Sequence, residues 1–247
     1  MPKLTWDAVG ERTYETGTKN GVLYPLANDG TYPQGYAWNG LTSVTESPSG
    51  AEANAVYADD IKYVELRSAE DYGATIEALS YPPEWEDCDG SREVAPGVVI
   101  GQQDRKPFGF VYKSVKGNDS KKNEYGYKIH ILYNGTASTS ERQYQTVNES
   151  PETITFSWEV TTTPIPVLST GGTVMTDANG NEYKPTSHLV IDSTKFTTTA
   201  EKARLAALET ILFGGEGTSA VANLPLPGAI IEALQAPSGA TGTTTGA

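Results

Sequence analysis

Alternating apolar and polar positions predict that most of this chain forms β-strands. The clearest pattern is at residues 154–161, where aromatic and β-branched side chains such as Phe156 and Trp158 alternate with threonine, serine and glutamate. Residues 108–115 and 125–133 show the same period of two. The charged, glycine-containing segment 116–124 between them predicts a hairpin loop. Shorter patterns at 21–27 and 187–192 predict further strands.

A second group of strands is predicted at 36–45, 55–66 and 72–81. Pro82 and Pro83 end this group, because proline has no backbone N–H to donate to a neighbouring strand. The segment 46–54 is polar and contains proline and glycine, so it predicts a long loop between the first two strands. These strands carry an acidic bias, and we expect their sheet to require neighbours.

Helical periodicity is strongest at residues 200–213, where leucine and isoleucine recur on one face and Gly214 follows as a cap. Thr199 is the expected N-cap. Lys202 stands three residues later, so no capping box is expected. A second, short amphipathic helix is predicted at 227–234, a helical turn at 83–91, and a peripheral hairpin at 167–185.

The ends of the chain differ in composition from the part between them. Residues 1–20 are polar and glycine-punctuated, which predicts an extended N-terminal arm. Residues 237–247 contain mostly glycine, threonine and alanine, which predicts a disordered tail. The expected organisation is therefore one body at 21–236, with the 46–54 loop inserted in it and C-terminal helices at 200–213 and 227–235.

Composition and charge narrow the class of protein. The 247 residues include 25 Gly and 15 Pro, which suits a turn-rich β protein, and the single cysteine excludes an intrachain disulfide framework. No apolar run approaches the ~20 residues that a membrane helix needs, and we expect neither a membrane partner nor a secretory signal. The net charge of −13 is uneven: residues 1–95 hold 17 acidic and 6 basic residues. This excess argues against tight binding to phosphates.

Catalytic chemistry is not evident in the sequence. The chain has two histidines, His130 and His188, and both are expected to be structural. No Gly-x-Ser-x-Gly, His-Glu-x-x-His or phosphate-loop motif is present. Adjacent carboxylates such as Asp59 and Asp60 point to opposite faces of a strand and cannot converge on a sugar by their spacing alone. We expect no enzyme activity, no metal and no cofactor.

Several sequence strings resemble the major tail proteins, or tail tube proteins, of long-tailed non-contractile bacteriophages (siphophages). They are WNGLTSVTESPSGAE at 38–52, YADDIKY at 57–63, GATIEA at 73–78, EDCDGS at 86–91, PGVVIGQQ at 96–103, YGYKIH at 125–130, SPETITFSWEVTTTP at 150–164 and LPLPG at 224–228. Each string alone is an ordinary strand or turn sequence, and the resemblance as a whole covers roughly residues 21–235.

This resemblance implies a mainly β (α+β) fold. The subunit would be a tail-tube-type β-sandwich or barrel with one flanking helix, and hexameric rings of it would close a central β-barrel. The rings would stack into a tube through which the genome leaves the capsid. The implied partners are further copies of the chain and the tape measure, tail terminator and baseplate or tail-tip proteins of the phage. DNA would pass without sequence-specific binding. The protein would be made in the bacterial host cytoplasm and reside in the virion tail.

Two sets of residues follow as candidates for assembly and for the lumen of the tube. The candidate inter-ring loop consists of Glu46, Ser47, Pro48, Ser49, Gly50, Ala51 and Glu52. The candidate acidic lumen consists of Asp59, Asp60, Glu65, Glu70, Asp71 and Glu77. Their orientation depends on strand register, because a slip of one residue reverses the face.

Two other functions remain open from the sequence. The tyrosine and tryptophan content permits a monomeric carbohydrate-binding β-sandwich module. The second alternative is the tube protein of a contractile injection system, which would also assemble as stacked rings.

Overall fold

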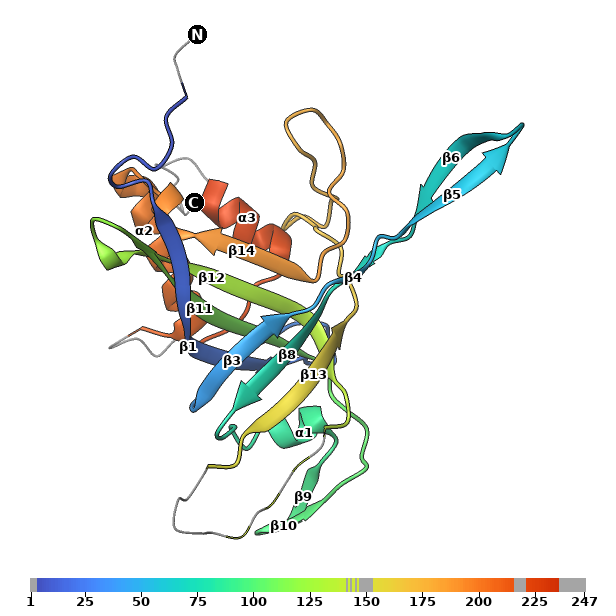
Figure 1. Ribbon diagram of the computed structural model, residues 1–247. Coiled ribbons are helices and arrows are strands. Elements are labelled where there is room, and N and C mark those ends of the chain that lie inside the picture. Colours follow the sequence, from blue (N-terminus) through green and yellow to red (C-terminus); the bar gives the residue numbers. More distant parts are fainter. Residues whose placement is uncertain are drawn as a thin grey trace, which may run out of the picture.

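A computed structural model describes residues 4–140, 142, 144, 146, 153–215 and 221–235 (Figure 1). The strands are β1 (Thr13–Pro25), β2 (Tyr36–Trp38), β3 (Leu41–Glu46), β4 (Ser49–Gly50), β5 (Ala53–Ala58), β6 (Ile61–Arg67), β7 (Glu70–Asp71), β8 (Gly73–Ala78), β9 (Arg92–Ala95), β10 (Val98–Ile100), β11 (Phe108–Asn118), β12 (Lys122–Ala137), β13 (Phe156–Thr162) and β14 (His188–Asp192). The helices are α1 (Trp85–Asp89), the 3-10 helix η1 (Ser193–Lys195), α2 (Thr199–Phe213) and α3 (Pro227–Gln235).

One large antiparallel sheet organises the chain. Its strand order is β2-β1-β11-β12-β13-β8-β3, and β14 pairs with β12 beside this path. The two end strands, β2 and β3, are consecutive in sequence, so the sheet curls until its edges approach each other (Figure 1). A Cβ added to Gly21 of β1 would lie 3.0 Å from Leu41 Cδ2 of β3. Within the described ranges β2 and β3 do not pair, so the curled sheet remains open.

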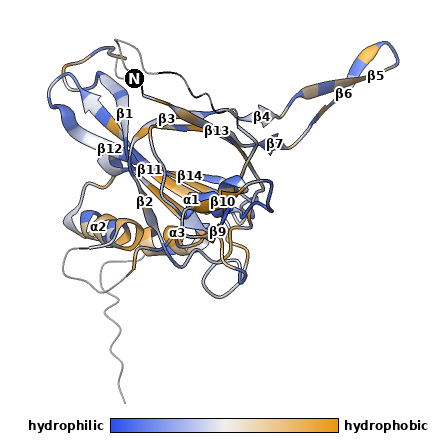
Figure 2. Ribbon diagram, turned by 90° about the horizontal axis from the view of Figure 1, so that it is seen from below, coloured by the Kyte–Doolittle hydropathy of each residue, from blue (hydrophilic) through white to orange (hydrophobic). Residues whose placement is uncertain are grey.

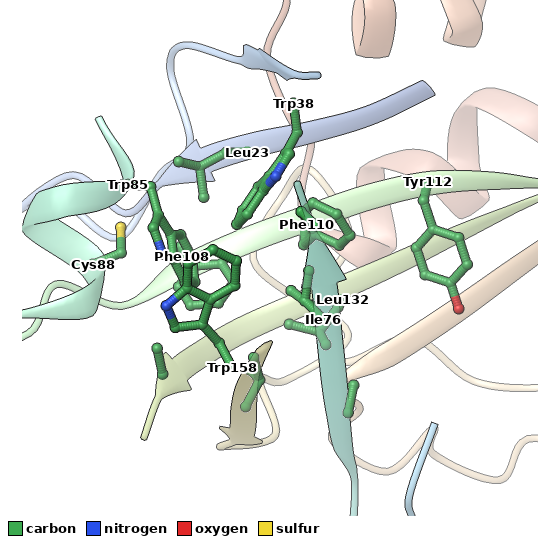
Figure 3. Close-up of a cluster of buried hydrophobic side chains, with 14 residues drawn as sticks. Leu23, Trp38, Ile76, Trp85, Cys88, Phe108, Phe110, Tyr112, Leu132 and Trp158 are labelled. Carbon is green, nitrogen blue, oxygen red and sulfur yellow. The ribbon is translucent and has the colours of Figure 1, made fainter. Parts of the chain in front are cut away.

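The inner face of the curled sheet buries an aromatic core (Figure 3). The rings of Trp38, Trp85 and Trp158 lie 4.7–5.6 Å apart between centroids and meet at tilted or edge-to-face angles. Phe108 packs edge-on against Trp85 at 4.8 Å. These geometries are the favourable ones for aromatic pairs, and each pair contributes about 0.5–1.5 kcal/mol beyond its buried area. This core joins β1, β11 and β12 to β8 and β13.

The opposite face of β1, β11, β12 and β14 packs against the C-terminal helices. The buried side chains of this second core are Val22, Tyr24, Tyr32, Val111, Ile129, Ile131, Tyr133, Ile191, Leu205, Leu208, Leu212, Leu224 and Ile230. Tyr24 donates its phenol to the carbonyl of Leu212, near the end of α2. Two helices cover this face, at the positions predicted from the sequence, whereas the family resemblance implied one flanking helix (Figure 2).

Helix α2 begins one residue earlier than its pattern predicts. Thr198, and not Thr199, is the N-cap, and its hydroxyl accepts from the Glu201 N–H at 3.2 Å. Glu201 in turn accepts from the Thr198 N–H at 2.9 Å. A capping box is therefore present, and the sequence prediction that none forms is wrong. The two possible pairs of N-cap and third helical residue, Thr198/Glu201 and Thr199/Lys202, differ by one residue. Only the backbone geometry decides which threonine is the N-cap.

Two expected strands are each split by a turn. The predicted strand 36–45 is β2 and β3, separated by Asn39 and Gly40, where Gly40 has φ +76°. The predicted strand 55–66 is the hairpin β5–β6, because Asp59 and Asp60 both adopt positive φ, 50° and 62°. Two central residues with positive φ match the twist of a two-residue hairpin turn. Aspartate tolerates positive φ, and the prediction of one continuous strand over 55–66 did not take this into account.

The expected boundaries at the ends of the chain also change. Residues 13–20 of the predicted N-terminal arm belong to β1, which pairs with β11, so among the described residues only 4–12 precede the sheet. The predicted 116–124 loop shortens to the turn between Asn118 and Lys122. The predicted tail at 237–247 lies outside the described residues.

The fold class is mainly β with a large antiparallel sheet, as predicted from the sequence. No described helix has the length and apolar character that crossing a membrane requires.

Candidate assembly interface

A long two-stranded ribbon leaves the body beyond the ends of β3 and β8 (Figures 1 and 2). We call residues 47–72 the arm. Its root is the β4–β7 pair, with Ser49 opposite Asp71 and Gly50 opposite Glu70. Its outer part is β5–β6, which pairs from Ala53 opposite Arg67 to Ala58 opposite Ile61, with a register shift at Tyr63. In the described part of the chain β5 and β6 pair only with each other. An isolated two-stranded ribbon is at best marginally stable in water, which makes the arm a candidate contact surface.

Large apolar side chains cover the arm and face solvent. Tyr57, Ile61 and Tyr63 are 70%, 62% and 72% exposed. Cross-strand partners share a face, so the Val56–Val64 and Ala58–Ile61 pairs place Val64 and Ile61 on one face of the ribbon, and Tyr57 lies on the other. Tyr63 stands at the register shift between these pairs. Both faces of the ribbon therefore carry apolar side chains. Large exposed apolar side chains gathered on one projecting element are a feature of interaction sites, so the arm is a candidate interface.

The residues predicted as the inter-ring loop comprise the last residue of β3 and the ascending side of the arm root, including β4. These are Glu46, Ser47, Pro48, Ser49, Gly50, Ala51 and Glu52. The N–H of Ser47 donates to the Gly73 carbonyl at 2.8 Å, and that of Ala51 to the Ala69 carbonyl at 3.2 Å. The segment 46–54 is thus paired backbone and not a loop, and the projecting tip is at Asp59 and Asp60. The sequence analysis did not predict the β5–β6 hairpin, because its turn at Asp59 and Asp60 was interpreted as part of a strand.

The six predicted lumen residues are not brought together. Asp59 and Asp60 lie at the arm tip, and Glu65 lies on β6. Glu65 also forms ion pairs with Lys62 and Arg67, which offset its charge locally. Glu70 and Asp71 lie at the arm root, and Glu77 lies on β8, where it accepts from the Ser43 hydroxyl at 2.7 Å. Of the six, only Glu77 lies on the large sheet.

The outer side of β3, β8 and β13 is a polar surface. Its members alternate with core residues such as Ile76 and Trp158, and the strand register places them side by side. We call this the outer polar face: Ser43, Thr45, Thr75, Glu77, Ser157, Glu159 and Thr161. It consists of hydroxyl and carboxylate side chains with no lysine or arginine. The Thr-Ser-Glu alternation at 153–161 was the sequence signal for this face.

Strand β3 also offers an unpaired edge. It pairs with β8 on one side, and none of the described strands pairs with its other side. An edge strand of this kind presents free N–H and C=O groups to another chain.

A polar cluster lies at the base of the arm, and the sequence reasoning missed it. We call it the root cluster: Glu46, Tyr72, Tyr112, His130 and His188. Glu46 Oε1 accepts from the Tyr112 phenol at 2.8 Å and lies 3.2 Å from His130 Nδ1 and 3.4 Å from His188 Nε2. Tyr72 is also hydrogen-bonded to Glu46. The cluster joins β3, β11, β12 and β14, which no sequence spacing reveals.

The aromatic rings of the root cluster are stacked. Tyr112 and His130 lie 4.6 Å apart between centroids at 5°, and Tyr72 and His188 lie 4.4 Å apart at 16°. His130 and His188 face each other at 5.9 Å and 18°. Stacking fixes the ring planes, so the nitrogen atoms that face Glu46 have defined positions.

Burial determines the protonation of the root cluster. Desolvation lowers the pKa of His130 and of His188, although the charge of Glu46 opposes this in both. Desolvation alone would raise the pKa of Glu46, but the Tyr112 hydrogen bond and the two histidines lower it overall. At neutral pH the cluster therefore holds a carboxylate beside two neutral imidazoles.

No family model matches the chain, and no curated protein matches it. Among solved structures, it is similar to one chain of the anti-feeding prophage (AFP) baseplate, determined by cryo-EM with 6-fold symmetrisation. The match is 10% identical, covers 64% of this chain and 92% of that chain, and has a TM-score of 0.35. This is a weak similarity to a phage-derived assembly, and not to a siphophage tail tube in particular.

Proposed function

We propose that this chain is a structural virion protein whose hexameric rings stack into the tail tube of a long-tailed phage. The observation that carries the proposal is the arm, whose apolar side chains have no partner strand among the described residues of their own chain. Repeated copies of one subunit supply that partner when a contact is head-to-tail. A contact of this kind that does not close along the axis produces a filament.

The arm provides the contact between rings in this proposal. Full burial of one large apolar side chain stabilises by about 1.5–3 kcal/mol, and the arm carries several of them. Ring symmetry repeats the contact in each subunit, so a modest contact per subunit gives a stable stack. The free β3 edge supports lateral association when it pairs with a different edge of the neighbouring subunit, because such heterologous pairing can close into a ring and removes exposed edges.

The outer polar face forms the wall of the conduit in this proposal. Its hydroxyl and carboxylate groups offer DNA no cationic contact, and carboxylates repel the phosphate backbone. DNA then passes without sequence-specific binding. This assignment replaces most of the acidic residues predicted from the sequence, since only Glu77 belongs to both sets.

The remaining parts of the proposal follow from a tube role. The tape measure, tail terminator and baseplate or tail-tip proteins of the phage are the expected partners, and the virion tail is the expected location. The chain is not expected to be an enzyme. In support, desolvation raises the pKa of the buried Cys88 to about 12, which keeps this thiol protonated and unreactive at neutral pH.

Assembly of the purified full-length chain tests the proposal. Light scattering after size exclusion at rising concentration, with negative-stain microscopy, is expected to show rings or tubes. Replacing Tyr57, Ile61 and Tyr63 together by serine is expected to stop stacking at monomers or single rings. Tyr183→Ser, which alters an exposed tyrosine outside the arm, is the matched control. A wild-type chain that stays monomeric and binds glycans would overturn the proposal, and a sheath around the tube in particles would assign it to a contractile system.

A further inference from the structure

Both histidines of the chain meet at one carboxylate. His130 on β12 and His188 at the start of β14 are 58 residues apart in sequence. Their nitrogen atoms and the Glu46 carboxylate oxygen all lie within 4.8 Å of one another. The two histidine side chains are largely shielded, with exposed fractions of 12% for His130 and 20% for His188, and the Glu46 side chain is 34% exposed. Two imidazoles and a carboxylate are a ligand set for a divalent transition metal.

The hydrogen bonds around these ligands are compatible with a bound cation. His130 Nδ1 lies at hydrogen-bond distance from Glu46 Oε1, 3.2 Å, and a cation would take the place of the proton between them. Ser114 Oγ lies 3.0 Å from His130 Nε2 and would then accept from the Nε2 proton. His188 Nε2 is buried and has no hydrogen-bond partner among the described residues. A buried imidazole nitrogen without a partner is costly, and a bound cation satisfies it.

We propose that Glu46, His130 and His188 bind one divalent transition metal ion of the Zn²⁺ class at the base of the arm. The Glu46–His130 and Glu46–His188 atom separations, 3.2 Å and 3.4 Å, already match the spacing of two ligands around one tetrahedral ion at bond lengths of about 2.0–2.2 Å. Only the separation between the two histidine nitrogens has to contract.

The surroundings match those of metal ligands. A metal-binding histidine typically hydrogen-bonds through its second ring nitrogen, as His130 does with Ser114, and ligating carboxylates are themselves hydrogen-bonded, as Glu46 is by Tyr112 and Tyr72. Imidazole nitrogen disfavours Ca²⁺ and Mg²⁺, which prefer oxygen ligands. The exposed third of Glu46 leaves access from solvent, and a water molecule completes the tetrahedral set.

A metal ion here would cross-link three strands. Glu46 is the last residue of β3, next to the arm, whereas His130 and His188 belong to the opposite layer of the curled sheet. The ion would therefore hold the arm root against the body and fix the direction in which the arm leaves it. This inference does not depend on tube assembly, because the site lies within one subunit.

Calorimetric titration of the tag-free, EDTA-treated full-length chain with ZnCl₂ at pH 7.5 tests the site. The expected result is one ion per chain, with no binding of Mg²⁺ under the same conditions. Glu46→Gln and His188→Gln are each expected to weaken Zn²⁺ binding by roughly 10-fold or more. Glu77→Gln, on the neighbouring β8, is expected to bind like the wild type. Wild-type stoichiometry well below one, or unchanged affinity in both ligand variants, would overturn the proposal.

The wild-type chain alone provides a second test, which needs no variant to fold. With two histidines, its imidazole proton NMR signals are few, and both sets are expected to shift together at one equivalent of Zn²⁺. Signals that respond to pH but not to Zn²⁺ would show a proton-binding cluster without a metal and would overturn the proposal.

Discussion

The phenol of Tyr112 on β11 donates a hydrogen bond of 2.8 Å to Glu46 Oε1 at the end of β3. Tyr112 also belongs to the aromatic core (Figure 3). This one contact therefore links the core of the body to the base of the arm. Desolvation raises the pKa of Tyr112, and the Glu46 hydrogen bond raises it further. The phenol therefore remains a donor over the working pH range, and the arm root is held by a persistent contact.

The conformation of Gly50 makes the arm root sensitive to substitution. Gly50 has φ +82°, and a Cβ there would lie 2.4 Å from the Ala69 carbonyl oxygen on the opposite side of the ribbon. We expect Gly50→Ala to disrupt the β4–β7 pair and reduce assembly while the body stays folded, as measured by light scattering and circular dichroism.

Gly97→Ala is the matched control, because Gly97 has φ +76° but nothing within 4 Å of its added Cβ. Equal loss of assembly in both variants would show that backbone strain alone is responsible, and that the close approach at the arm root is not.

Stability is expected to fall in mild acid. The folded-state pKa of His130 and of His188 lies below the ordinary 6.5, so below that pH the unfolded chain binds more protons than the folded chain. The free energy of unfolding therefore decreases as pH drops below about 6.5. The lowered pKa of Glu46 acts in the same direction at lower pH, because its stabilisation is lost as the carboxylate becomes protonated.

Urea unfolding in EDTA between pH 7.5 and 5.5 measures this dependence. His130→Gln combined with His188→Gln is expected to flatten it across that range. An unchanged slope in the double variant would place the responsible groups elsewhere.

Helix α2 is expected to contribute strongly to the stability of the body. Leu212 is fully buried against the sheet, and Leu212→Ala is expected to reduce the free energy of unfolding by about 2–5 kcal/mol. The neighbouring Ile211 is 39% exposed, so Ile211→Ala is expected to cost about 1 kcal/mol or less. Denaturant titration of both variants measures the contrast, and similar losses would show that α2 does not dock by the Leu212 face.

Charge on the outer polar face is expected to control passage of DNA. Replacing Glu77 and Glu159 together by lysine turns a repulsive wall into an attractive one, so tubes are expected to form but DNA ejection to slow. The defect should weaken as salt concentration rises, because counterion release drives binding to phosphates. Glu182→Lys, in the peripheral hairpin, is the control. Normal ejection kinetics in the double variant would remove this face from the conduit.

Local patterns in the sequence determined most of the secondary structure. The alternation at 154–161 predicted β13, and the leucine periodicity at 200–213 predicted α2, because burial on one face imposes a period of two on strands and of 3.6 on helices. The predicted ends of helices and strands were wrong where two interpretations of the sequence differed by one residue or by one turn. The cap at Thr198 and the turn at Asp59 and Asp60 are examples.

Only the tertiary structure decided which distant residues meet. The arm exists because β5 and β6 fold back on each other at a two-residue turn, and the outer polar face exists because the register aligns three strands. Glu46, His130 and His188 each appear ordinary in their own strand. They form a site because the curled sheet brings β3 close to β12 and β14. Positions in the sequence do not predict this proximity in space.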